Sequence, residues 1–168
     1  GADVIKLEPF EGDDTRGLGP PFDGNGLSAY FACCNRNKRS LAIDLAAPAS
    51  RPLFEALVRQ ADVLVENFRT GGAERLGAGY AALSALNPRL VYCSISGYGR
   101  DGPGATLPGY DYAVQAEAGL LAITGPVRRP NWPTFMPGQL WMPKIASIGN
   151  LSNRPSLIIS RAPPPPSS

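Results

Sequence analysis

The stretch 65–69 (VENFR) combines side chains that could bind a nucleotide. It lies at the end of an apolar run, and ligands of open α/β sheets bind at the carboxyl ends of the strands. Phe68 could stack on a purine ring, Asn67 could hydrogen-bond a base edge, and Arg75 could reach a phosphate. The alternative is that Phe68 packs in the core and that Arg75 is an ordinary surface charge. The pattern alone leaves both interpretations open.

Two further stretches have compositions that could bind anions. The polar and basic stretch 35–40 (NRNKRS) could pair with a phosphate, or it could be an ordinary solvated loop. Residues 97–102 match the G-x-G-x-x-G pattern of dinucleotide-binding turns. That pattern must open a helix whose N-terminus holds the pyrophosphate, but Pro103 and Gly104 follow it here. We therefore interpret 97–102 as a glycine-rich loop rather than as an NAD site.

Histidine is absent from the chain, which excludes acid–base catalysis by histidine and argues against zinc sites. The three cysteines, Cys33, Cys34 and Cys93, have neither the spacing of metal ligands nor an even count for a disulfide framework. The sequence therefore predicts no metal. It also predicts a reducing, intracellular compartment: the cytoplasm or, in a eukaryote, the mitochondrial matrix.

The carboxylates are confined to the front of the chain. All 14 acidic residues lie in positions 1–117, ending with Asp111 and Glu117. Asp111 could act as a nucleophile, but it falls in the first turn of a predicted helix, where the helix dipole favours an acid. The basic residues after position 117 are scattered among prolines without a pattern of stacking aromatic residues, and no apolar run is long enough to span a membrane. We predict neither a nucleic-acid nor a membrane partner.

Short apolar runs alternate with helical patterns along the first part of the chain. The runs lie at 4–7, 41–45, 63–65 and 90–95. Helical patterns cover 53–61, 80–86 and 110–124, the second ending at Asn87-Pro88. This alternation predicts a parallel α/β sheet with flanking helices, a Rossmann-like layered domain.

The sequence predicts two parts of different character. Residues 1–125 form the α/β domain, whose opening strand has no helix before it, so we expect its first strand–helix unit to be missing. The chain begins at Gly1 rather than Met, which favours a fragment. Residues 126–168 hold 10 of the 18 prolines and end in a proline run, which predicts an irregular, disordered tail. A shifted reading frame or alternative exon would explain the change, and so would a natural Pro-rich tail.

Several blocks, in order, resemble the class III CoA-transferases, the family of formyl-CoA:oxalate and succinyl-CoA:glutarate transferases. The matching blocks are GADVIKLE at 1–8, GDDTR at 12–16, NRNKRSLAIDL at 35–45, ADVLVENFR at 61–69, NPRLVYCSISGYG at 87–99 and GYDYAVQA at 109–116. The resemblance implies that an Asp carboxylate attacks an acyl-CoA thioester, and that CoA then passes through an aspartyl-CoA intermediate to a small carboxylic acid. CoA is then a substrate, and no cofactor is bound covalently. Family members form interlocked homodimers, which we do not expect of this chain.

The resemblance also implies a set of CoA-contacting residues, with Phe68 against the adenine, Arg75 near a phosphate and Tyr110 near the thioester. The whole set is Ile43, Asn67, Phe68, Arg75, Leu76 and Tyr110. The family's nucleophilic Asp lies downstream of the position of Thr124-Gly125, where this chain has no Asp. We therefore expect no catalytic residue here and an inactive chain.

Two alternatives remain at this point. One is an isomerase fragment similar to 2-methylacyl-CoA racemases, which rely on a His/Asp pair that this chain cannot supply because it has no histidine. The other is a non-catalytic protein that binds CoA or interacts with another subunit.

Overall fold

The computed structural model describes residues 1–109, 111–119 and 157–162. These residues fall into two compact units. The first comprises 1–95 and 157–162, and the second comprises the described residues from 96 to 119.

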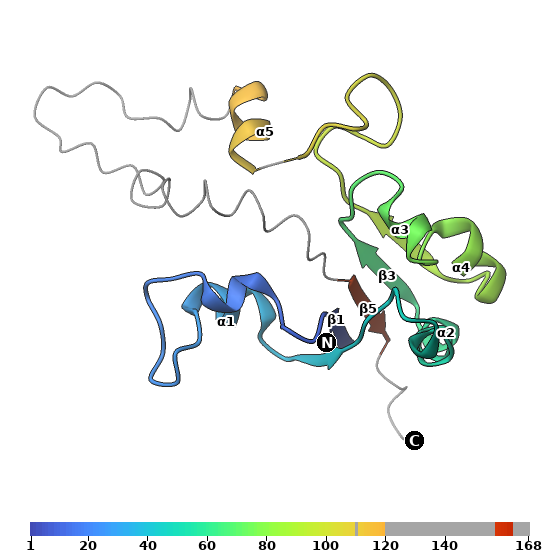
Figure 1. Ribbon diagram of the computed structural model, residues 1–168, viewed down its shortest axis with the longest axis horizontal. Coiled ribbons are helices and arrows are strands. Elements are labelled where there is room, and N and C mark those ends of the chain that lie inside the picture. Colours follow the sequence, from blue (N-terminus) through green and yellow to red (C-terminus); the bar gives the residue numbers. More distant parts are fainter. Residues whose placement is uncertain (110, 120–156, 163–168) are drawn as a thin grey trace, which may run out of the picture. The chain divides into compact units, whose positions relative to one another are not determined.

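A five-stranded sheet with the order β2-β1-β5-β3-β4 organises the first unit (Figure 1). β1 is parallel to β2, and β3 is parallel to β4. β5 runs antiparallel to both β1 and β3, so the other four strands all point the same way. The strands are β1 Asp3–Glu8, β2 Lys38–Ala42, β3 Val63–Glu66, β4 Val91–Ser94 and β5 Leu157–Arg161.

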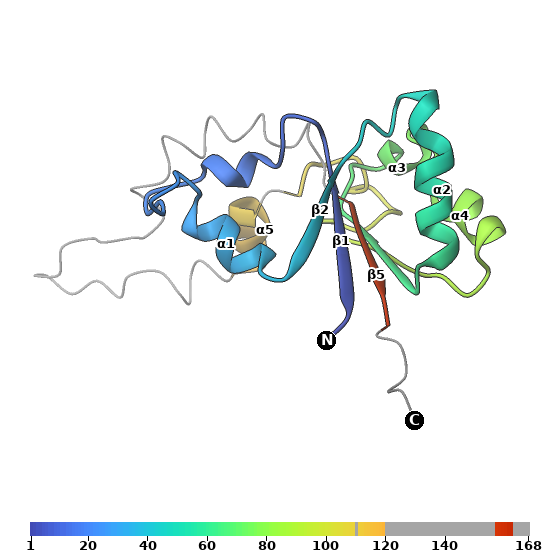
Figure 2. The same cartoon turned by 90° about the horizontal axis from the view of Figure 1, so that it is seen from below.

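The helices of this unit cover the two faces of the sheet. Figure 2 shows α2 and α4 on one face and α1 on the other. α2 forms because Phe54, Leu57, Val58 and Ala61 recur at helical spacing and face the sheet, with a proline in its first turn. The helices are η1 Asp14–Gly17, α1 Ala29–Asn35, η2 Pro48–Ser50, α2 Arg51–Gln60, α3 Gly72–Arg75 and α4 Tyr80–Leu86.

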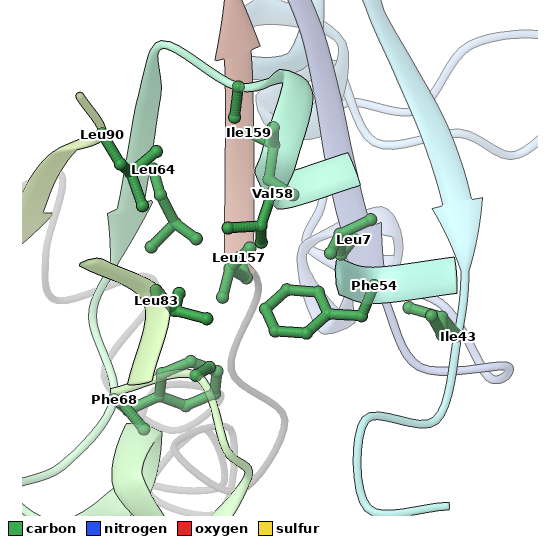
Figure 3. Close-up of a cluster of buried hydrophobic side chains, with 13 residues drawn as sticks. Leu7, Ile43, Phe54, Val58, Leu64, Phe68, Leu83, Leu90, Leu157 and Ile159 are labelled. Carbon is green, nitrogen blue, oxygen red and sulfur yellow. The ribbon is translucent and has the colours of Figure 1, made fainter. Parts of the chain in front are cut away.

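The hydrophobic core lies between the sheet and the α2–α4 layer (Figure 3). β1, β3 and β5 contribute Leu7, Leu64, Leu157 and Ile159, which are all buried in the same cluster as Phe54 of α2. Leu7 and Glu66 are both register partners of Leu157, so the carboxyl ends of β1 and β3 lie at the same level. This alignment brings the loops that follow the parallel strands to one edge of the sheet.

In the second unit the glycine-rich stretch packs against itself. A Cβ added to Gly97 would lie 2.4 Å from the Cα of Gly109, so glycine is required for this close approach. The Tyr98 side chain lies against Gly104, and its hydroxyl hydrogen-bonds Glu117. The next described helix after this stretch is α5, Asp111–Glu117. The segment is therefore a packed glycine-rich loop, as predicted, and does not open a helix as a dinucleotide-binding turn would.

The structure confirms the α/β class and the parallel strands at β1, β3 and β4, and α4 has the bounds that the sequence predicts. The prediction of a strand at 41–45 is wrong in position: the strand, β2, runs from Lys38 to Ala42. It ends early because Asp44 forms a turn, accepting from the backbone N–H groups of Ala46 at 2.9 Å and Ala47 at 3.2 Å. Its polar start is tolerated because β2 is an edge strand.

The prediction of an irregular tail fails for residues 157–161, which form β5. The alternation of this strand explains the difference. Leu157 and Ile159 point into the core and are buried, while Ile158 and Ser160 face the other side and are half-buried. The rest of 120–168, except Ala162, lies outside the described residues, as does the end of the helix expected at 110–124.

Candidate functional site

The candidate site is the segment Asn67–Leu76, which follows β3 at the carboxyl edge of the parallel strands. A left-handed Gly71 (φ 78°) turns the chain into α3. The backbone N–H of Gly72 donates to the Arg69 carbonyl at 2.7 Å, which closes the turn. Sequence reasoning placed these residues at a strand end, and the structure confirms that position.

A buried carboxylate fixes the start of this segment. Glu66, the last residue of β3, is 2% exposed, and its Oε2 accepts the backbone N–H of Phe68 at 2.7 Å. Burying a carboxylate is costly unless hydrogen bonds compensate, so this contact holds the chain in one path as it leaves the sheet. Sequence reasoning missed this role of Glu66. The available signal was an acid that ends an otherwise apolar strand.

Phe68 anchors the segment to the core. Its side chain is 5% exposed and belongs to the core cluster, where Figure 3 shows it on the opposite side of Phe54 from Ile43. The interpretation of Phe68 as a packing residue therefore describes this structure. In this structure the ring holds the loop against the core. The role expected for Phe68 against adenine stays a prediction.

Arg75 and Asn67, in contrast, face outward. Both are exposed, and a Cβ added to Gly71 would lie 3.2 Å from a terminal guanidinium nitrogen of Arg75. Within the part of the chain that the structure describes, no hydrogen bond or ion pair is formed by the Arg75 guanidinium. An arginine held beside a glycine turn, with its donors open, is suited to bind a phosphate.

The other predicted contact residues divide between the segment and its surroundings. Leu76 is half-buried and packs against the core cluster, while Ile43 is buried directly after β2 at the same sheet edge. Arg51 of α2 donates to the Gly77 carbonyl at 2.7 Å and so ties down the far end of the segment. Tyr110 lies outside the described residues.

A second charged cluster lies at the end of β1, and sequence reasoning missed it. Lys6 and Glu8 alternate with Leu7, so they face away from the core. Lys6 pairs with Asp13, while Arg16 donates to Glu8 at 2.6 Å. Ser40 of β2 also donates to Glu8, and the Phe31 ring lies 4.8 Å from the Lys6 nitrogen and 4.2 Å from the Arg16 guanidinium carbon. We call Lys6, Glu8, Asp13, Arg16 and Ser40 the β1 cluster.

The ionised forms of the two acids in the β1 cluster are stabilised. Burial alone would raise the pKa of Asp13, but hydrogen bonds from Lys6 and Thr15 outweigh it and lower the pKa to about 2. Burial likewise opposes the charge on Glu8, yet hydrogen bonds from Arg16 and Ser40 lower its pKa below the ordinary value. Since these partners are all internal, the cluster stabilises the fold.

The basic stretch 35–40 does not join the candidate site. Lys38 starts β2 and is the register partner of Val4, so it lies at the amino end of the parallel strands, opposite the Asn67–Leu76 segment. Lys38 donates to Asn35 at 3.4 Å, and Arg39 pairs with Asp3 at 2.5 Å. The interpretation of the stretch as a solvated loop holds only for residues 36 and 37, because Asn35 ends α1 and residues 38–40 belong to β2.

Two further properties hold for the described residues. They contain no group of three or more His, Cys, Asp or Glu side chains arranged to hold a metal ion. No helix among them has the length and hydropathy needed to cross a membrane.

Ligands of open α/β sheets bind at the carboxyl ends of the strands, which is the edge where the candidate segment lies. The model of CoA-transferase family III matches residues 1–152, and the chain belongs to this family. It is 52% identical to the succinate–glutarate CoA-transferase of Agrobacterium fabrum over 74% of this chain and 33% of that protein. It is 48% identical to the acetyl-CoA:oxalate CoA-transferase of Acetobacter aceti over 74% of this chain and 32% of that protein.

A solved structure shares the fold. The crystal structure of a CAIB/BAIF family protein from Brucella suis aligns with a TM-score of 0.71 at 42% identity, covering 91% of this chain and 41% of that one. The chain spans about a third of the length of the curated relatives named above.

Proposed function

We propose that the Asn67–Leu76 segment is part of a CoA-binding surface. In this proposal the surface serves the transfer of CoA from an acyl-CoA to a small carboxylic acid. The observation that carries the proposal is Arg75: an exposed guanidinium, with no internal partner in the described residues, on a loop fixed at both ends. CoA carries several phosphate groups, and charge-assisted hydrogen bonds from arginine suit them.

The contact residues divide into two roles. Asn67 and Arg75 bind the nucleotide part of CoA directly, because their side chains are exposed. Leu76 and Ile43 supply apolar surface beside it, and Tyr110 lies near the thioester, as the family resemblance implies. Phe68 positions the loop from below, because it is buried.

The transfer step needs a nucleophilic carboxylate. An aspartate attacks the thioester carbonyl, forming a mixed anhydride and releasing the CoA thiolate. The thiolate then attacks the enzyme's own carbonyl of that anhydride, which gives aspartyl-CoA and frees the donor's carboxylate. An acceptor carboxylate attacks the aspartyl thioester, and the thiolate finally takes the acyl group of the new anhydride.

We propose that this chain does not carry out that step alone. Its last Asp is Asp111, which is the first residue of α5. An acid in the first turn of a helix is favoured by the helix dipole, and this accounts for Asp111 without a catalytic role. Glu117, the last acidic residue, is engaged by Tyr98. The chain therefore binds CoA without transferring it.

Calorimetric titration of the full chain with CoA tests the proposal. We expect saturable binding that Arg75→Gln weakens about tenfold, equivalent to about 1.4 kcal/mol. Arg89→Gln is the matched control, because Arg89 is also exposed but precedes β4 at the opposite edge of the sheet. A folded chain that does not bind CoA, or equal losses in the two variants, would contradict the proposal.

Activity assays separate the alternatives. With succinyl-CoA and glutarate we expect no CoA transfer, and with a chiral 2-methylacyl-CoA we expect no racemisation. CoA transfer by the unchanged chain would contradict the proposal that it is inactive. If that transfer persisted in Asp111→Asn, the nucleophile would be a residue other than Asp111.

A further inference from the structure

The helix that carries Arg75, α3, is a single turn. It spans Gly72–Arg75 and lies between two glycines with left-handed backbone, Gly71 and Gly77. A helix this short is not stable by itself, because the first turn fixes several residues for one hydrogen bond. The direction of α3, and with it the position of the Arg75 side chain, therefore depends on contacts with the rest of the unit.

Apolar contacts hold α3 against the core but leave its direction open. Ala73, within the helix, and Ala78, just after it, are 1% and 0% exposed. The burial of apolar surface is a non-directional force, so methyl groups of this size allow the short helix to pivot. A hydrogen bond prefers one direction, and a hydrogen bond at the end of α3 can set what these contacts leave open.

Two hydrogen bonds hold the residues that follow α3. The Arg51 guanidinium donates to the Gly77 carbonyl at 2.7 Å, and the Tyr92 hydroxyl donates to the Ala78 carbonyl at 3.0 Å. The bond from Arg51 is charge-assisted, and such bonds are stronger than those between neutral groups. It also acts closer along the chain to Arg75. Arg51 is therefore the stronger of the two contacts that hold the end of α3.

Arg51 is itself held in place on α2. Its Nε donates to Glu55 Oε1 at 2.6 Å, one turn along the helix, and its guanidinium carbon lies 5.8 Å from the centre of the Phe54 ring. A Cβ on Gly77 would collide with a terminal nitrogen of Arg51, so the close approach of the two residues requires glycine. Because α2 packs on the core, Arg51 fixes the end of α3 relative to the core.

We propose that Arg51 is a positioning residue of the CoA site. Its hydrogen bond to the Gly77 carbonyl sets the direction of α3 and so places the Arg75 guanidinium where it meets a phosphate of CoA. This inference rests on the function proposed above for the Asn67–Leu76 segment. In this proposal Arg51 acts through Arg75 rather than on CoA itself. A change at Arg51 should therefore weaken CoA binding only while Arg75 is present.

A double-mutant cycle in the full chain tests the proposal. CoA affinity is measured by calorimetry for the wild type, Arg51→Gln, Arg75→Gln and the double variant, each below its melting temperature. We expect Arg51→Gln to weaken binding about three- to tenfold by itself, but less than about twofold in the Arg75→Gln background. Two residues that acted independently would instead show the same fold-loss in both backgrounds.

Two further variants of α2 sharpen the cycle. Arg59→Gln is the matched control, because Arg59 lies 3.9 Å from the same Glu55 carboxylate but at the opposite end of α2 from Arg51. It should change CoA affinity less than about twofold, as exposed ion pairs contribute little. Arg51→Lys keeps one charged donor for the Gly77 carbonyl without the fork that also reaches Glu55, so its loss should be smaller than that of Arg51→Gln.

Two results would overturn the proposal. One is an equal fold-loss from Arg51→Gln with and without Arg75, which would make Arg51 an independent contact or a general stabiliser. The other is unchanged affinity in Arg51→Gln while Arg75→Gln is weakened, in which case the CoA site would stand without this role for Arg51. If Arg51→Gln did not fold, the cycle would be run with Arg51→Lys and judged in the same way. Absence of CoA binding by the folded wild type would overturn the proposed function, and this inference with it.

Discussion

Two charged regions at the carboxyl edge of the sheet are built in opposite ways. In the β1 cluster every charged side chain has an internal partner, and Lys6, Glu8 and Asp13 are largely removed from water. In the Asn67–Leu76 segment an apolar side chain, Phe68, holds the loop, while Asn67 and Arg75 remain exposed. Charge that is satisfied internally stabilises the fold, and charge held open on a fixed loop is available to a ligand. The predictions below test that division.

The largest effect is expected at the apolar anchor. Phe68→Ala removes a buried ring and should lower the free energy of unfolding by about 3–5 kcal/mol, whereas Phe68→Leu should cost less than about 1.5 kcal/mol. Urea denaturation measures both. If Phe68→Ala left the free energy of unfolding unchanged, the ring would not anchor the loop. The interpretation of Phe68 as a residue that contacts the adenine of CoA would then be favoured.

The next effect is expected in the β1 cluster. Asp13→Asn removes the partner of the buried Lys6, and it should lower the free energy of unfolding at pH 7 by about 2–3 kcal/mol, since each pKa unit corresponds to about 1.4 kcal/mol. Glu11→Gln is the control, because Glu11 is exposed and close in sequence; it should change stability by less than about 0.5 kcal/mol. If both changes lowered the free energy of unfolding equally, the β1 cluster would not stabilise the fold more than an exposed carboxylate does.

The acid sensitivity of the fold should follow from the same pair. The pKa of Asp13 is lowered from 3.8 to about 2, so its contribution to stability is complete above pH 3.8 and is lost as the pH falls toward 2. The stability difference between the wild type and Asp13→Asn should therefore shrink over that range. A difference that stayed constant between pH 5 and pH 2 would contradict the ion pair.

The smallest effect on stability is expected at the candidate ligand-binding residue. Arg75→Gln should change the free energy of unfolding by less than about 0.5 kcal/mol, because its side chain is exposed and has no partner among the described residues. Thermal unfolding without ligand measures this. A large loss would mean that Arg75 has a structural role.

The same contrast explains what could be predicted from the sequence. α4, β3 and β4 follow from local hydrophobic periodicity, and the Asn67–Arg75 region follows from the rule that ligands bind at strand ends. The β1 cluster escaped prediction because its pairs join residues up to 32 positions apart, and because two charges on one strand face suggest an exposed surface. β5 escaped because its partners in β3 and β1 lie at least 91 positions away, and no local pattern encodes such a pairing.

CoA titration and thermal unfolding of Arg75→Gln and Asp13→Asn, beside the wild type, would separate ligand-facing charge from internal charge. We expect opposite results for the two variants. Arg75→Gln should lose CoA affinity and keep its melting temperature, while Asp13→Asn, below its lowered melting temperature, should keep its CoA affinity. If Arg75→Gln instead lost stability and kept its affinity for CoA, the division between internal and ligand-facing charge would be wrong.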